Sequence, residues 1–179
     1  AGKLSIDIPA YDYPDFAKGT IRLGRELTAE DFDIPAPAGA AEVKARVIGV
    51  VENQAPTKAL ERTLTVENGL VAGDLAQDVC QIALVERHRA TGEVVTGFVS
   101  GFGYKVPCAM ASTVANDSHH MIVVGTNKAD MALAANRAAQ VGGGVVVISQ
   151  GKELALVELP IAGLMSDERA EIVAEKADR

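Results

Sequence analysis

Two of the three histidines of the chain lie in the segment ANDSHHMIVVG, residues 115–125. The two histidines, His119 and His120, follow Asp117 and Ser118. This segment therefore offers a carboxylate, a hydroxyl and two imidazoles. Groups of these types can transfer protons, form a nucleophile with its base, or bind a metal ion. The alternative is a polar turn whose carboxylate and hydroxyl accept hydrogen bonds from free backbone N–H groups before a buried strand begins. The spacing by itself leaves both interpretations open.

Several kinds of self-contained active site are excluded by the sequence. Ser118 and His119 are adjacent, so on a strand their side chains point to opposite faces, and no Gly-x-Ser-x-Gly motif is present. A zinc-dependent base deaminase needs His-x-Glu and Pro-Cys-x-x-Cys, but Cys108 is followed by Ala111 where the second cysteine should be. Three histidines are too few for the metal centre of an amidohydrolase barrel. We therefore expect no metal ligands in this chain.

Two other segments could bind an anion. The glycines at 142–144 lack the Lys-Ser/Thr of a phosphate loop and follow a predicted helix, so a helix end and tight turn is expected there. His88, flanked by Arg87 and Arg89, could hold an anion, although a solvated hairpin tip is the commoner explanation for such a segment.

Composition restricts the class of protein. The net charge of −7 and the absence of long basic runs argue against nucleic-acid binding. No apolar run approaches the ~20 residues needed to cross a bilayer, so no membrane association is expected. Two cysteines, Cys80 and Cys108, are too few for a disulfide scaffold and fit a cytoplasmic protein. The chain does not begin with Met, which suggests a piece of a longer protein.

The elements that would position these residues form two regions. Residues 1–43 are rich in proline and predict an irregular N-terminal arm and linker, with short strands at 3–8 and 20–23 and a helix start at Thr28. Residues 44–179 are denser in apolar residues and predict a domain. Its predicted strands cover residues 45–51, 60–66, 79–87, 93–100, 121–125, 145–149 and 154–159, and 108–115 fits a buried strand or helix.

Two helices are predicted in this domain. The first follows a cap at Thr126 or Asn127, and its apolar face at helical spacing comprises Met131, Ala134, Ala135 and Ala138. The second has Ser166 as its N-cap. The expected fold class is α+β: a mostly antiparallel sheet of about six strands flanked by helices, in which residues 121–149 form one parallel βαβ crossover.

Three longer phrases carry a resemblance to a known family: RHRATGEVVTGFVSGFGYK at 87–105, ASTVANDSHHMIVVGTNKADMALAANRAAQVGGGVVVI at 111–148, and LPIAGLMSDE at 159–168. Together they resemble the C-terminal domain of bacterial adenine deaminase, a metal-dependent amidohydrolase. The resemblance runs from about Lys44 to the end of the chain. It implies that residues 1–43 connect to an upstream catalytic barrel, which is not contained in this chain and which holds the metal site that this domain closes.

The resemblance also assigns roles to residues. The family turn usually reads His-Asp-Ser-His-Asn, whereas residues 116–120 read Asn-Asp-Ser-His-His, so the central three carry over and the flanking His and Asn are exchanged. The implied catalytic residues are Asp117, Ser118 and His119. The implied substrate-binding residues are His120, Gly103 and Phe102, the last of which could stack on a purine or simply pack in the core.

The implied function is the hydrolysis of adenine to hypoxanthine and ammonia in purine salvage. The expected cofactor is a divalent metal, Mn, Fe or Zn, in the absent barrel, and the expected partners are adenine, that barrel and further copies of the protein in a homo-oligomer. The isolated chain is expected to be inactive. Two other interpretations stay open: a structural or dimerisation module without catalytic residues, and a stand-alone purine-binding module.

Overall fold

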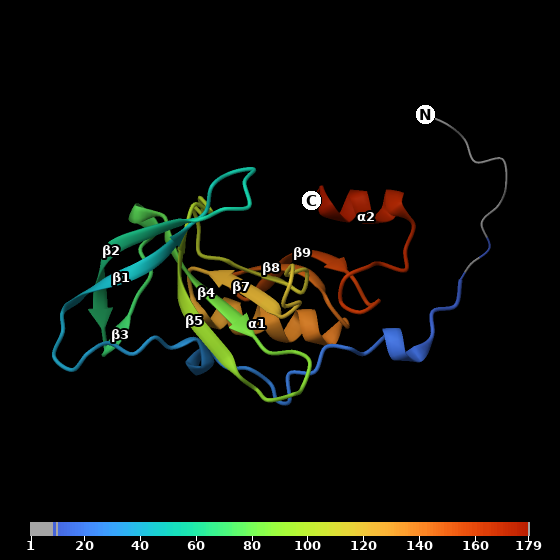
Figure 1. Cartoon of the computed structure of the whole chain (residues 1–179), viewed down its shortest axis with the longest axis horizontal. Helices are drawn as coiled ribbons and strands as arrows, with labels where there is room; N and C mark the ends of the chain where they lie inside the picture. Colours follow the sequence, from blue (N-terminus) through green and yellow to red (C-terminus); the bar gives the residue numbers. More distant parts are fainter. Residues whose placement is uncertain (1–8, 10, 179) are drawn as a thin grey trace.

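The computed structural model describes residue 9 and residues 11–178, and within them one nine-stranded sheet dominates the fold (Figure 1). The strand order is β3-β2-β1-β5-β4-β7-β6-β8-β9. The strands are β1 Glu42–Gly49, β2 Lys58–Glu67, β3 Leu70–Val71, β4 Val79–Val85, β5 Val94–Ser100, β6 Ala109–Ser112, β7 Met121–Gly125, β8 Gly144–Ser149 and β9 Lys152–Glu158. The helices are α1 Lys128–Gln140 and α2 Ala170–Ala177, with short 3-10 helices η1 Asp15–Ala17, η2 Ala29–Phe32 and η3 Leu75–Gln77.

The α+β class and the mostly antiparallel sheet are confirmed, but the expected number of six strands is wrong. Strand β3, of two residues, is too short to show a hydrophobic period, and β6 is the strand alternative of the predicted segment 108–115. The predicted crossover is also different in form. Strand β6 pairs antiparallel with both β7 and β8, so it lies between the two strands that α1 connects. The parallel pair of the described sheet is β1 with β5.

Helix α1 covers one face of the sheet. The four apolar residues predicted at helical spacing all have 0% exposure, and they are Met131, Ala134, Ala135 and Ala138. Asn127 caps the helix by accepting a hydrogen bond from Asp130 N at 2.8 Å, as predicted. A Cβ on Gly125 of β7 would lie 2.5 Å from Met131 Cγ, so only glycine permits this close approach of helix and strand. In Figure 1 the second helix, α2, lies on the other side of the sheet beside β9.

The arm before β1 is partly built into the same core. Leu23, Leu27 and Phe32 are buried in the cluster that α1 forms with the sheet. The predicted strand at 20–23 is wrong, because this segment makes single backbone contacts instead of a ladder; Arg22 N donates to Arg87 O at 2.8 Å. The predicted strand at 3–8 lies outside the described residues.

Local signals at turns and caps had mixed outcomes. Asn68 and Gly69 both have positive φ, 52° and 79°, which confirms the predicted tight turn. Thr28 and Asp31 form the predicted capping box at η2. Ser166 is not the cap of α2, which starts after Arg169; its hydroxyl accepts locally from Glu168 N at 3.2 Å. Among the described residues, no helix has the length and apolar character needed to cross a membrane.

Candidate functional site

The predicted catalytic turn lies at one end of the central strands, where β4 ends and β7 begins. These strands are antiparallel and Val85 pairs with Met121, so the residues after β4 meet the residues before β7. This arrangement brings all three histidines of the chain together. The rings of His88 and His120 lie 4.9 Å apart between centroids, and His88 Nε2 is 3.2 Å from Ser118 O.

The turn itself has an uncommon backbone. Asp117 and His119 have φ of 68° and 50°, in the left-handed region, which Asp and His adopt more readily than most other non-glycine residues. Two backbone bonds stabilise the turn: Ser118 N donates to Asn116 O at 3.0 Å and His119 N donates to Ala115 O at 2.8 Å. The Ser118 hydroxyl accepts from His120 N at 3.3 Å, as the polar-turn interpretation expects. The side chains of Asp117, Ser118 and His119 are nevertheless exposed.

The side chain of a buried arginine, Arg87, forms a hydrogen bond with the backbone of this turn. Arg87 is 2% exposed, although the sequence places it next to a predicted solvated hairpin tip. Its Nε donates to His119 O, and both of its terminal nitrogens lie 3.3 Å from Ala162 O. Burial lowers the pKa of the Arg87 guanidinium from its ordinary value. The hairpin-tip interpretation is wrong for Arg87, because it continues the inward face of β4 after Val85.

The neighbouring hairpin is held by Glu86. Its carboxylate accepts hydrogen bonds from His88 N, Arg89 N and Thr91 N, at 2.5, 2.9 and 3.2 Å. Burial acts to raise the pKa of Glu86, but these N–H groups outweigh it and bring the pKa down to about 2. The charge of Glu86 thus fixes the loop that carries His88.

His120 lies on the sheet face opposite α1, since it continues the alternation of Ile122 in β7. Its Nδ1 is buried and has no hydrogen-bond partner in the part of the chain that the structure describes. It borders a pocket of about 120 Å³ whose other walls include exposed apolar side chains; the lining residues are Leu84, Glu86, Glu93, Val95 and His120. Pockets for drug-sized ligands usually measure roughly 300 Å³ or more, so this one is small by comparison.

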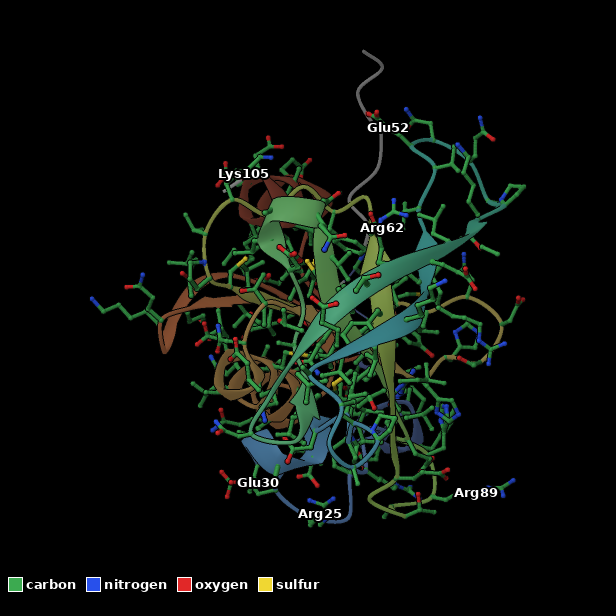
Figure 2. All side chains as sticks on the ribbon, turned by 90° about the vertical axis from the view of Figure 1, so that its left-hand side faces the viewer. Arg25, Glu30, Glu52, Arg62, Arg89 and Lys105 are labelled. Carbon is green, nitrogen blue, oxygen red and sulfur yellow. The ribbon has the colours of Figure 1, made fainter. Side chains whose placement is uncertain are left out.

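Two predicted substrate-binding residues lie elsewhere. Phe102 and Gly103 follow β5 and are tied to the start of β4, because the Asp78 carboxylate accepts from Gly101 N and Gly103 N at 2.8 Å. They lie at the opposite end of β7 from the turn, about 13 Å along the strand. Figure 2 shows the two ends, with Lys105 in the Phe102 loop at the top and Arg89 in the His88 hairpin at the bottom.

The surroundings of Phe102 match core packing. Its ring lies 5.6 Å from that of Tyr104, and both pack against the cluster of Cys80, Val99 and Val124. Phe102 therefore packs at the end of β7 that is opposite the turn. Burial raises the pKa of the Cys80 thiol to about 11, which makes it unreactive.

No group of three or more His, Cys, Asp or Glu within the described residues is arranged to hold a metal ion. The site that the structure assembles is therefore an exposed polar turn of Asp117, Ser118 and His119, with His88 and His120 beside it and Arg87 beneath it. Sequence inspection missed Arg87 as part of this site. The available signal was its position two residues after Val85, which continues the inward alternation of the strand.

Comparison with known proteins places the chain in a family. A family model described as the adenine deaminase C-terminal domain matches residues 54–179. An adenine deaminase of Mesorhizobium japonicum is 72% identical over 178 residues, which are 99% of this chain and 29% of the relative. Adenine deaminase 3 of Rhizobium meliloti is 72% identical over 99% of this chain and 30% of its own length.

A more distant relative agrees with these. Adenine deaminase of Moorella thermoacetica is 46% identical over 98% of this chain and 29% of its own length. The chain thus spans less than a third of the length of these relatives. Because the family model covers more than half of the chain, we conclude that the chain belongs to the adenine deaminase C-terminal domain family.

Proposed function

We propose that this chain is the C-terminal part of an adenine deaminase, in which it closes the active site of an upstream metal-dependent barrel. The whole protein would hydrolyse adenine to hypoxanthine and ammonia. The names of the relatives and the small share of their length that this chain covers support this assignment. We also propose that the whole protein is cytoplasmic, acts in purine salvage and assembles as a homo-oligomer.

One observation carries the assignment of the site: the turn at residues 116–120 combines a strained backbone with exposed functional side chains. Each non-glycine residue in the left-handed region costs on the order of 1 kcal/mol, and such residues concentrate at active sites. Asp117 and His119 both adopt this region, yet their side chains do not stabilise a core. Two exposed side chains that can exchange protons, with a hydroxyl between them, support the proposal that this turn contacts a ligand.

The chemistry of the residues fits the proposed reaction. Replacement of the C6 amine of adenine by water needs a proton on the ring and a proton on the departing amine. His119 can donate or accept a proton, Ser118 can orient the amine by a hydrogen bond, and Asp117 can accept from either group. The metal, Mn, Fe or Zn, would be bound by the upstream barrel and supply the activated water. The described residues of this chain do not provide ligands for it.

The lining of the pocket at the turn supports a shared site rather than a stand-alone one. The pocket beside His120 is lined by none of Asp117, Ser118 and His119, so a purine in contact with those side chains would need walls from another part of the protein. Leu84 and Val95, which pair across β4 and β5 at its rim, are exposed and would be covered by such a wall. Phe102 and Gly103 are outside the proposed site, because they lie at the other end of β7.

The test compares single variants in the full-length protein. Ser118→Ala and His119→Ala are expected to lower kcat for adenine by 10²-fold or more, within the usual contribution of a general acid or base. Ser149→Ala is the matched control, because it removes a serine hydroxyl that makes one hydrogen bond, to Pro107 O at 2.7 Å, at the opposite end of the sheet. Unchanged kcat in both turn variants would rule out a catalytic role for the turn.

The rival function is a structural or dimerisation module. The hydrogen bond from His120 N to Ser118 Oγ favours it, because it gives the hydroxyl a purely local role. This interpretation expects Ser118→Ala and His119→Ala to change the oligomeric state or the thermal stability and to leave turnover intact. Sedimentation velocity and kcat measured on the same samples separate the two functions.

A further inference from the structure

We propose that Arg87 is a positioning residue for this active site: its buried guanidinium holds the backbone of the Ser118–His119 turn in the conformation that presents those side chains to the substrate. This inference rests on the proposed function of the turn. It assigns to Arg87 a role that acts through its neighbours and not by contact with adenine.

The contacts of Arg87 join two turns that are far apart in the sequence. Its Nε donates to the carbonyl of His119, and its two terminal nitrogens each lie 3.3 Å from the carbonyl of Ala162. Its own carbonyl accepts from Arg22 N at 2.8 Å, which fixes the arginine backbone to the N-terminal arm. Both His119 and Ala162 have positive φ, 50° and 57°. Arg87 therefore bonds two carbonyls whose residues are in a strained conformation.

The chemistry of a guanidinium suits this task. It is planar and presents five N–H donors in a fixed fork, so one side chain can hold two carbonyls at a defined angle. A lysine ammonium is a compact charge on a flexible stem and does not fix such an angle. Arg87 is 2% exposed and forms no ion pair within the described residues, so carbonyl groups and not a carboxylate stabilise its charge. Burial of a charge is costly unless it is hydrogen-bonded in this way.

The guanidinium packs closely against Gly163, which leaves no room for a larger residue at this position. A Cβ at this position would lie 3.0 Å from the Arg87 Nη1 atom, and Gly163 has φ of 72°. The Thr113 hydroxyl donates to Gly163 O at 2.6 Å and so holds the second turn against the sheet. The residues Ala162 and Gly163 thus form the fixed support on which Arg87 rests. Movement of the guanidinium would be passed to His119 through a single hydrogen bond.

The test uses Arg87→Lys in the full-length protein, with Arg89→Lys as the matched control. Arg89 undergoes the same chemical change two residues away, is exposed, and extends away from the molecule in Figure 2. We expect Arg87→Lys to lower kcat for adenine by about ten-fold to a hundred-fold, the loss that follows from a misplacement of about 1 Å. Arg89→Lys is expected to retain the original kcat.

A double-mutant comparison separates positioning from a general structural role. In the background of Ser118→Ala with His119→Ala, the side chains that Arg87 positions are gone, so Arg87→Lys should lower the residual kcat by less than about two-fold. A full additional loss in that background would overturn the inference, because it would mean that Arg87 acts elsewhere. Undiminished kcat of Arg87→Lys in the original background would overturn it as well.

A second variant guards against misfolding. Arg87→Ala leaves a cavity shaped for a guanidinium, and millimolar guanidinium chloride should restore part of its turnover if the hydrogen bonds to the two carbonyls are what matters. Failure of Ser118→Ala and His119→Ala to alter kcat would refute the proposed catalytic role of the turn and this inference together. Loss of kcat in those two variants with no effect of Arg87→Lys would refute the inference alone.

Discussion

Replacement of Asp130 with alanine should destabilise this domain strongly, because its carboxylate joins α1 to the turn between β8 and β9. Asp130 is 3% exposed. Its oxygens accept hydrogen bonds from Gln150 N at 2.9 Å, from Gly151 N at 2.8 Å and from Asn127 Nδ2 at 2.8 Å. Gln150 and Gly151 have positive φ, 51° and 75°, so these bonds also stabilise a tight turn.

The expected loss follows from these bonds. A hydrogen bond to a charged acceptor contributes about 1.5–3 kcal/mol. The two backbone donors of the turn, Gln150 N and Gly151 N, are near enough to water to form replacement hydrogen bonds with it, so we use the lower end of this range. The lower value for two bonds gives about 3 kcal/mol for Asp130→Ala. Asp130→Asn keeps one acceptor oxygen and should lose about half as much. The measurement is urea unfolding of the chain followed by circular dichroism.

The control is Asp167→Ala, which removes the same charge. The Asp167 side chain is 41% exposed and makes one ion pair, with Lys18 at 4.0 Å, so its loss should change the free energy of unfolding by less than about 0.5 kcal/mol. Equal effects of Asp130→Ala and Asp167→Ala would refute the reasoning, since they would show that the three hydrogen bonds of Asp130 add nothing to stability.

Three further predictions concern the core and the end of the central strands that carries the site. Gly163→Ala would place a Cβ 2.8 Å from Ile21 Cδ1 and 3.0 Å from Arg87 Nη1, at a residue with φ of 72°, and we expect kcat of the full-length protein to fall by about ten-fold; a steady-state assay with adenine checks this. The pKa of Glu86 is about 2 against an ordinary 4.5, so its contribution to stability is complete above pH 4.5 and is lost as the pH falls toward 2; thermal unfolding of Glu86→Gln should lack this dependence. Met131→Ala removes a side chain of 0% exposure and should cost about 2–5 kcal/mol in chemical unfolding, unless α1 collapses into the cavity.

Much of the secondary structure could be predicted because it depends on local signals. The alternation of apolar residues gave the longer strands, such as β2 and β4, and the spacing of Met131, Ala134, Ala135 and Ala138 gave the buried face of α1. Short strands such as β3 could not be predicted, since two residues contain no period. The start of α2 was misplaced at Ser166, because a serine that bonds a backbone two residues on resembles a helix cap.

The candidate site was only partly predictable for a different reason. The sequence identified the cluster from Asp117 to His120 and the resemblance to a family, because residue types and their order are visible without a fold. It could not show that Phe102 lies at the far end of β7, since strand register and direction decide that distance. It also could not show that His88 reaches Ser118, because that contact depends on which strands are neighbours.

The sequence by itself determined the residue types at the site, the class of fold and the family, because each of these depends on local pattern or on the order of residues. Only the tertiary structure decided which residues act together. Pairing of β4 with β7 brought Arg87 under His119, and the return of the chain after β9 brought Ala162 to the same guanidinium. These contacts join residues separated by 32 and 75 positions, and a pairing over such distances is set by packing of the whole sheet and not by any local signal.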